Sequence, residues 1–263
     1  PQATMNPRLQ FAELEEHPLR QRLNNEFHAR PPLPVVGPAL VSHLVFKHAE
    51  STMEQERENL TRLCQQQVCN SVDSSDTHLL VDAGSYRMRW ELHTEFSSYT
   101  FFRPLNAGEP LHPDTTAFDA VLPGWLAAIP GKLMVATHVE MRSANEMKPE
   151  SVLAAIAPGG RQMVAAQVAG GAAWVFTDFK IDNGFSRFLV LDVALTQRQA
   201  GRTIQRLVEI ETYRMMALLA FPVARKATPD LGAMETQLAA IVERIAGDTP
   251  EDVSPWSVPV AFR

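Results

Sequence analysis

The sequence has only two cysteines among its 263 residues, Cys64 and Cys69. Their spacing matches neither a CxxC redox motif nor a zinc-binding pattern, so we expect reduced thiols and a cytoplasmic protein. Long apolar runs are missing as well. No stretch approaches the roughly 20 residues needed to span a bilayer, and the polar, acidic N-terminal stretch has no signal-peptide core. We therefore expect no direct membrane insertion by this chain.

The chain also lacks a basic excess. It has 24 Lys and Arg residues against 30 Asp and Glu residues, which gives a net charge of −6 and an isoelectric point near 5.8. A general nucleic-acid-binding domain is normally basic, so we expect no nucleic-acid partner. The hydrophobic fraction of 45% and the charged fraction of 21% are those of a globular protein.

Signature motifs of common enzyme classes are absent. The sequence contains no Walker loop, GxGxxG motif, nucleophile elbow or HExxH motif. The glycine pairs Gly159-Gly160 and Gly170-Gly171 lack the strand-to-helix context of a phosphate loop. The fold and the ionisable side chains are therefore the remaining guides to function.

The apolar pattern predicts an α+β fold with a largely antiparallel sheet covered by helices. Short loops between the strands favour antiparallel pairing. The segments expected to form strands are 39–48, 78–103, 132–142 and 161–195. The segments expected to form helices are 8–28, 51–67, 118–129, 145–157, 197–219 and 232–246, with Pro222 separating the last two.

We expect one domain over 1–246 and an irregular tail at 247–263. The two halves of the chain contain similar sequence segments, AGSYRMRWELHTEFSSYTFFR and AGGAAWVFTDFKIDNGFSRFL. One interpretation is an internal pseudo-repeat of 39–103 and 132–195, each a strand–helix–strand–strand–strand unit. The other is a chance similarity between two aromatic hairpins.

Four sequence segments resemble those of a known family, and the resemblance extends from about residue 17 to about residue 246. They occur in the order HPLRQRLNNEFHARPP, RWELHTEFSSYTF, TDFKIDNGFSRFLV and AGRTIQRLVEIETYRMMALLAFPVAR. Together they resemble a bacterial family of predicted membrane-anchored proteins of unknown function. The resemblance implies no particular activity. It implies that members usually continue into a further helical region and a hydrophobic C-terminal anchor, both of which we expect this chain to lack.

The segment from Arg87 to Phe96 is the first candidate site. As one continuous strand it would place alternate side chains on one face, namely Arg87, Arg89, Glu91, His93 and Glu95. A histidine beside a carboxylate can act as a general base, and arginine binds carboxylate or phosphate. One interpretation is a pocket for a small anionic molecule. The other is a solvated ladder of ion pairs.

Three further residues are assigned to anion binding together with Arg89. His28 and Arg30 precede the proline-rich turn RPPLPVVGP, where positive charge would also complement the negative end of a helix. Arg103 ends the strand that follows the charged segment. The predicted binding residues are therefore His28, Arg30, Arg89 and Arg103.

Glu211 joins His93 and Glu95 as a predicted acid–base group. It interrupts the apolar face of the 197–219 helix, and a buried carboxylate needs a cationic partner such as Arg89 or Arg187. A purely structural ion pair is the alternative. We expect Arg89 and His93 to face this helix, so that Glu211 can meet them in a polar cavity.

Two HxE pairs raise a metal-binding alternative. Residues i and i+2 of a strand share a face, so His93 with Glu95 and His138 with Glu140 would supply two imidazoles and two carboxylates. That ligand set suits iron, manganese or zinc. The alternative is that both pairs lie on the solvated face of an antiparallel sheet.

We thus expect a cytoplasmic domain whose polar pocket binds a small anionic molecule, with acid–base catalysis left open. No cofactor is expected unless the HxE pairs hold a metal ion. The alternatives are a non-enzymatic interaction or scaffolding module derived from a membrane-anchored protein, and a metal-dependent enzyme. Homodimerisation is left open.

Overall fold

The computed structural model describes residues 17–18, 20–21, 31–48, 53–66, 77–106, 109, 115–121, 124–146 and 162–247. The chain divides into two compact units, Pro1–Thr212 and Tyr213–Arg263. The expected single domain over 1–246 stays a prediction. The helices expected at 8–28 and 145–157 lie almost entirely outside the described residues. The tail at 248–263 also lies outside them.

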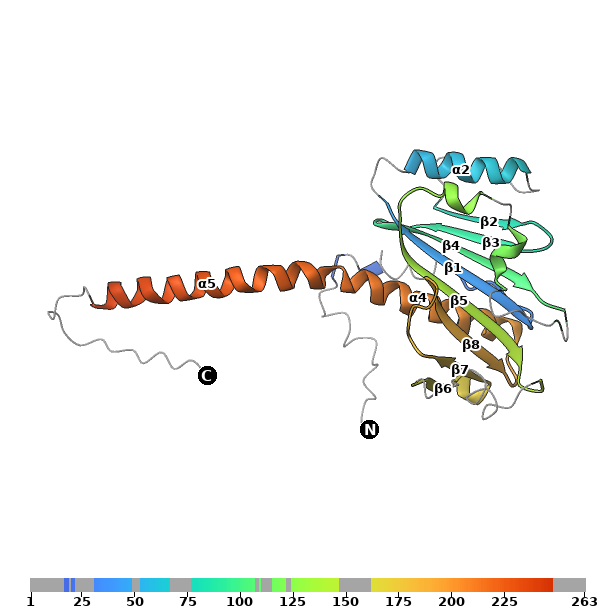
Figure 1. Cartoon of the computed structure of the whole chain (residues 1–263). Helices are drawn as coiled ribbons and strands as arrows, with labels where there is room; N and C mark the ends of the chain where they lie inside the picture. The colour runs from blue at the N-terminus through green and yellow to red at the C-terminus, as the bar shows by residue number, and fades with distance from the viewer. Residues whose placement is uncertain are drawn as a thin grey trace, which may run out of the picture. The chain divides into compact units, whose positions relative to one another are not determined.

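An eight-stranded sheet forms the first unit, in the order β2-β3-β4-β1-β5-β8-β7-β6 (Figure 1). Every neighbouring pair of these strands is antiparallel except β5 and β8, which are parallel. The predicted α+β class with a largely antiparallel sheet is confirmed. The strands are β1 (Ala39–Lys47), β2 (His78–Asp82), β3 (Arg87–Leu92), β4 (Phe96–Pro104), β5 (Lys132–Ser143), β6 (Val164–Val168), β7 (Ala173–Thr177) and β8 (Ser186–Asp192).

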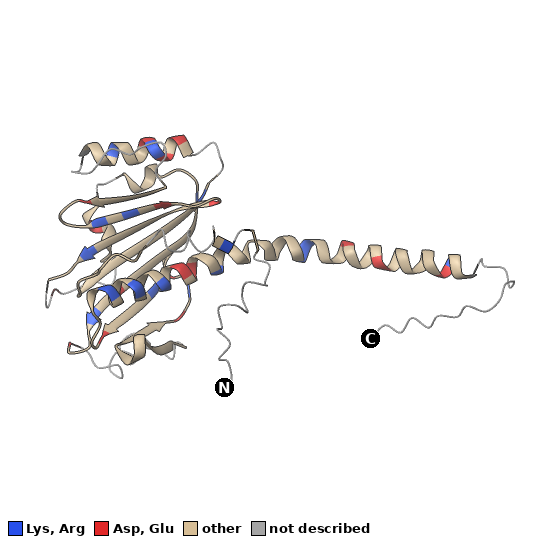
Figure 2. Ribbon diagram, turned by 180° about the vertical axis from the view of Figure 1, so that it is seen from behind, with Lys and Arg blue, Asp and Glu red and all other residues tan. Residues whose placement is uncertain are grey.

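Helices cover both faces of the sheet (Figures 1 and 2). The α2 face packs against α2 (Met53–Gln66) and the short 3-10 helices η3 (Ala117–Ala120) and η4 (Leu126–Ala128). The α4 face packs against α4 (Gln197–Leu218). The α2-face core includes Leu60, Leu63, Met88, Trp90, Tyr99 and Phe101. The α4-face core includes Val41, Phe102, Val139, Phe188, Ile204 and Val208.

The start of α4 is fixed by a capping box and by close backbone contact. The Thr196 hydroxyl accepts from the Gln199 backbone N–H at 3.3 Å, and the Gln199 side-chain oxygen accepts from the Thr196 N–H at 2.9 Å. One turn later a Cβ on Gly201 would overlap the carbonyl oxygen of Leu33. Glycine therefore lets α4 lie directly on the backbone of the proline-rich segment.

The expected continuous strand from Arg87 to Phe96 is wrong. β3 ends at Leu92, and β4 begins at Phe96. The residues between them form a tight hairpin in which the His93 N–H donates to the Phe96 carbonyl at 2.8 Å. The alternation of side chains that predicted a charged face therefore does not extend to Glu95. Glu95 is exposed at the turn.

The second unit contains α5 (Ala220–Gly247), a longer helix than the 232–246 segment expected. Pro222 was expected to break the chain before this helix, but it lies in its first turn. Proline is tolerated there because the first N–H groups of a helix have no intrahelical acceptor. The helix expected at 118–129 is likewise replaced by the two short helices η3 and η4.

The strand order does not show an internal duplication. Each half contributes four neighbouring strands, and β1 lies beside β4 as β5 lies beside β8. The first of these pairs is antiparallel, however, and the second is parallel. The pseudo-repeat stays a hypothesis.

Cys64 is disulfide-bonded in the structure, so the expected reduced thiols are wrong. Cys69 is the only other cysteine of the sequence, and it lies outside the described residues. Disulfides are typical of oxidising compartments. The cysteine content therefore no longer supports the predicted cytoplasmic location.

Candidate functional site

A row of buried polar side chains crosses five strands on the α4 face. The pairing registers align Arg89 with Thr100, Thr100 with His43, His43 with Thr137, and Thr137 with Ser186. Each of these side chains is at most 9% exposed. We call this set the polar row: Arg89, Thr100, His43, Thr137 and Ser186.

Hydrogen bonds connect the polar row internally and to α4. His43 Nδ1 lies 2.9 Å from Thr100 Oγ1, and His43 Nε2 lies 3.1 Å from Thr212 Oγ1. Because the Thr212 hydroxyl donates to the Val208 carbonyl at 2.7 Å, it must accept from Nε2–H, and Thr100 must donate to Nδ1. Thr137 and Ser186 are joined at 2.9 Å.

His43 is held neutral by its surroundings. Burial, followed by the positive charges of Arg89 and His93, lowers the pKa of the imidazole to about 3. Both ring nitrogens are occupied by hydroxyl groups. Through these two hydrogen bonds the neutral His43 connects the sheet to α4. It is therefore not available as a general base.

Arg89 faces α4, as expected, while its neighbour Trp90 lies in the α2-face core. The Arg89 guanidinium pairs with Glu91 at 3.3 Å, and its Nη1–H donates to the Pro31 carbonyl at 3.3 Å. Its Nε is buried without a hydrogen-bond partner in the described structure. Arg89 is thus a neutralised, buried charge.

The predicted acid–base residues lie on two elements, the β3–β4 turn and α4. His93 is half-buried at the β3–β4 turn, where its ring stacks on Phe96 at 4.2 Å between centroids. Glu95 is exposed at the same turn. Glu211 is only 2% exposed on α4, immediately before Thr212, so its predicted burial beside the sheet is observed.

The HxE metal site has the wrong geometry. His93 and Glu95 do not lie in a strand, and His138 lies on the α2 face. There its Nδ1 is 2.8 Å from Ser42 Oγ and its ring stacks on Phe185. Among the described residues, no group of three or more His, Cys, Asp or Glu side chains could hold a metal ion.

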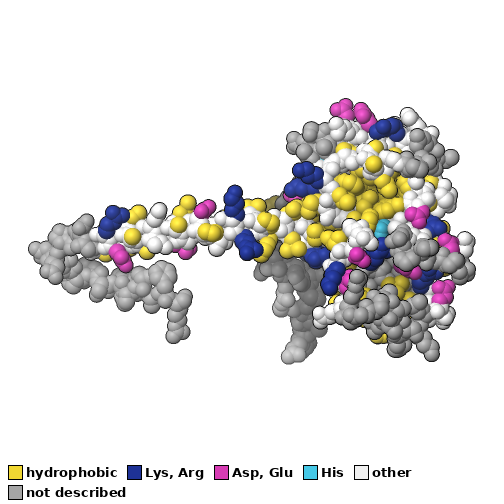
Figure 3. Space-filling view, in the orientation of Figure 1, with side chains coloured by type: hydrophobic (Ala, Val, Ile, Leu, Met, Phe, Trp, Pro, Cys, Tyr) yellow, Lys and Arg dark blue, Asp and Glu magenta, His cyan; other side chains and the backbone are white. Residues whose placement is uncertain are grey.

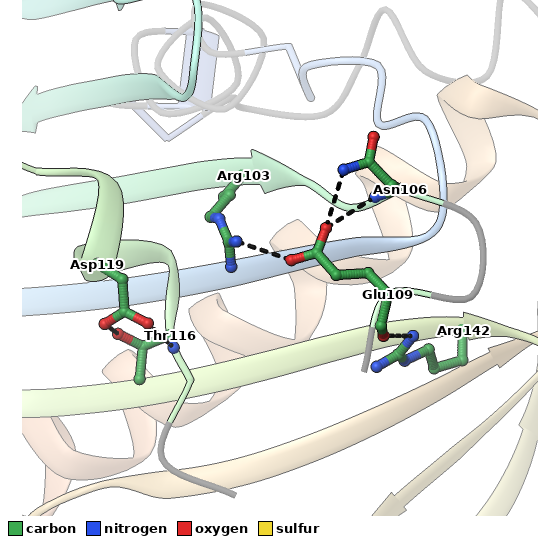
Figure 4. Close-up of polar contacts among 6 residues, drawn as sticks. All are labelled: Arg103, Asn106, Glu109, Thr116, Asp119 and Arg142. Atoms are coloured by element: carbon green, nitrogen blue, oxygen red, sulfur yellow. Dashed lines mark hydrogen bonds and ion pairs between the residues drawn. The ribbon is translucent and has the colours of Figure 1, made fainter. Parts of the chain in front are cut away.

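Glu140 and Arg103 each belong to an ion pair near the same end of the sheet. Glu140 binds Arg142 at 2.7 Å. Arg103 binds Glu109 at 2.8 Å, and Asn106 donates to the same carboxylate through its N–H and its side-chain amide (Figure 4). The Asn106 backbone N–H, followed by the Arg103 charge, lowers the pKa of Glu109.

A cavity of about 270 Å³ lies at the N-terminal end of α4. It is lined by Pro34, Val35, Val36, Ala39, Arg87, Phe102, Arg103, Pro104 and Gln197. Arg87 spans it by donating to the Pro34 carbonyl at 2.8 Å, and its guanidinium carbon lies 5.9 Å from the centre of the Phe102 ring. Of the four predicted binding residues, Arg103 lines this cavity, whereas His28 and Arg30 lie outside the described residues.

Sequence reasoning missed several residues of this region. Arg87 was grouped with its neighbours but given no role, and His43, Thr212 and Gln197 were not singled out. The proline-rich segment signalled a rigid backbone, but no local pattern indicates that it would meet the start of α4. The contact between the proline-rich segment and the start of α4 arises only in the tertiary structure.

A family model for proteins of unknown function, DUF3422, matches residues 15–255. The chain belongs to this family. The predicted membership of a family of unknown function is therefore confirmed. Among curated proteins and solved structures, nothing matches the chain. In the part of the chain that the structure describes, no helix combines the length and apolarity needed to cross a membrane.

Proposed function

We propose that this DUF3422 chain binds a small anionic molecule in the cavity at the N-terminal end of α4. The observation that carries the proposal is the position of Arg87. Within the described residues, Arg89 is paired with Glu91 and Arg103 with Glu109, but no carboxylate lies within ion-pair distance of Arg87. A guanidinium in this state favours an anionic ligand.

The surroundings of Arg87 support the same ligand class. Its Nη2–H is fixed by Pro34, and its position over Phe102 restrains the side chain, so the remaining N–H groups are pre-oriented. The cavity lies at the N-terminal end of a 22-residue helix, where partial positive charge favours anions. Val35 and Phe102 supply apolar walls.

The cavity volume limits the size of the ligand. About 270 Å³ is slightly below the range of roughly 300–1,000 Å³ typical of drug-sized ligands. A short carboxylate, or a phosphate carrying a small apolar group, fits this space. The proposal is one of binding rather than catalysis, because both nitrogens of His43 are engaged and Glu95 is exposed at a turn.

Isothermal titration calorimetry with phosphate, acetate and butyrate, in a low-chloride buffer, tests the proposal. We expect at least one of these anions to bind, and Arg87→Gln to weaken that binding about tenfold or more. Arg206→Gln is the matched control, because Arg206 is exposed on α4 and does not line the cavity. Absence of binding by all three probes, or equal losses in both variants, would refute the proposal.

A further inference from the structure

Helix α5 carries a long row of exposed, large apolar side chains. All of its residues from Ala220 to Ala246 are exposed, and Figure 3 shows apolar side chains along it. The exposed fractions of the row range from 43% to 68%. Its members, which we call the α5 seam, are Leu231, Met234, Leu238, Ile241 and Ile245.

The spacing of the α5 seam is that of a coiled-coil heptad. Successive members are separated by alternating steps of three and four residues, so they occupy the a and d positions of a two-helix seam. Ala224 and Ala227 continue the same positions toward the N-terminal end of α5. Pro229 and Gly232, which weaken a helix, fall at f and b positions away from the seam.

We infer that a second copy of this chain docks on the α5 seam, so that two α5 helices pair in antiparallel fashion. In one register every seam residue meets a seam residue or a small alanine. Leu231 then faces Ile241 of the second copy, and Met234 faces Leu238. Ile245, at the end, faces Ala227, so that a large side chain meets a small one.

The flanking charges distinguish antiparallel from parallel pairing. In the antiparallel register the g-position residue Asp230 lies beside Arg244 of the second copy, and symmetry repeats this attraction. Only one like-charge contact arises, between the two Glu235 residues at the symmetry axis. Parallel pairing would instead place Asp230 beside Glu235 twice, without a compensating attraction.

The α5 helix is complementary to itself in both its apolar layers and its flanking charges. We therefore infer that the partner on the α5 seam is a second copy of this chain and not an unrelated helix. An unrelated partner would need only an apolar stripe. The chain's own sequence supplies opposite charges at Asp230 and Arg244 in the register that also aligns the apolar layers. A two-fold pair satisfies both conditions at once.

Sedimentation equilibrium of the full 263-residue chain tests the inference. We expect a reversible dimer, and Leu238→Asp should weaken association at least 100-fold by placing two charges in the central layers. Thr236→Asp, at an outward f position of the same turn, is the matched control and should leave the dimer intact. Circular dichroism of both variants reports helix content. A monomer at about 100 µM, or equal effects of the two variants, would overturn the inference.

Charge reversal tests the antiparallel register separately. At low salt Asp230→Arg and Arg244→Asp should each weaken association by about tenfold, because each turns two attractions into repulsions. The double variant should recover wild-type association to within about twofold. Glu243→Arg, on the outer face, should have little effect. A dimer that the double variant fails to restore would refute the antiparallel register.

Discussion

Tyr99 donates a 2.6 Å hydrogen bond to the carboxylate of Glu56 beneath helix α2. The indole N–H of Trp90 donates to the same oxygen at 2.9 Å. Glu56 is only 1% exposed, and both donors are buried in the α2-face core. A carboxylate thus joins α2 to β3 and β4 through two neutral donors, an arrangement that its position in an amphipathic helix did not indicate.

Glu56→Ala should lower the free energy of unfolding by about 3 kcal/mol, because it leaves a buried hydroxyl and a buried indole N–H without an acceptor. Glu56→Gln keeps one acceptor oxygen and should cost about half as much. Urea unfolding measures both values. The control is Glu58→Ala, at an exposed position of the same helix, which should cost less than about 0.5 kcal/mol. Equal costs for the two alanine variants would contradict the buried network.

Two buried histidines predict loss of stability in acid. Burial, then Arg89 and His93, lowers the pKa of His43 to about 3. Burial, then Arg187, lowers the pKa of His138 to about 4, against an opposing effect of Asp119. Because both pKa values are depressed on folding, the stabilisation is present above the unfolded value of about 6.5 and is lost as the pH falls toward 4 or 3.

Each histidine should therefore reduce the free energy of unfolding by about 2 kcal/mol between pH 7 and pH 5. His43→Gln and His138→Gln should each remove about half of the combined loss, whatever their effect at neutral pH. Urea titrations at the two pH values check this difference. A wild-type chain whose stability is the same at both would show that these imidazoles protonate freely.

Glu211→Gln should cost on the order of 3 kcal/mol, because it disrupts the interactions of a buried carboxylate on α4. Glu95→Gln is the matched change at the exposed β3–β4 turn, and we expect it to stay within about 0.5 kcal/mol of wild type. Thermal and urea unfolding of the pair should separate them clearly. A large cost for Glu95→Gln would mean that the turn is packed more tightly than observed.

Two of the helical glycines, Gly201 and Gly232, predict opposite outcomes for the same substitution. Gly201→Ala should destabilise the first unit by about 1–3 kcal/mol, since the added methyl group meets the Leu33 backbone. Gly232→Ala has open space in α5 and should raise helix stability by about 0.5–1 kcal/mol. Unfolding curves and helix content distinguish the two. Stabilisation by both would show that α4 does not lie on the proline-rich segment.

Much of the fold followed from local patterns. Alternating apolar residues identified the strands, and the carboxylate of Glu211 in an apolar helix face pointed to a buried position, which the structure has. The β3–β4 turn was missed because His93, Thr94 and Glu95 include no glycine, proline or asparagine to signal it. The alternation of apolar and polar residues that predicts a strand continues through these three residues.

The polar row could not have been predicted in the same way. Its members lie on five strands and meet only through the pairing register, which depends on the order β3-β4-β1-β5-β8. His43 in particular sits in the apolar run ALVSHLVFK, where nothing local indicates hydroxyl partners. The parallel pairing of β5 with β8 is equally non-local, because the two strands are separated by the β6–β7 hairpin.

The order of the sheet leaves β2 and β6 at its two edges. β2 begins with His78 and ends with Asp82, whereas β6 has the sequence VAAQV, without charge or proline, and most of its side chains are exposed. Edge strands normally discourage pairing with other molecules through charge, proline or a bulge. Apart from its short length, β6 has none of these protections, so aggregation of partly unfolded chains should begin by strand addition along β6.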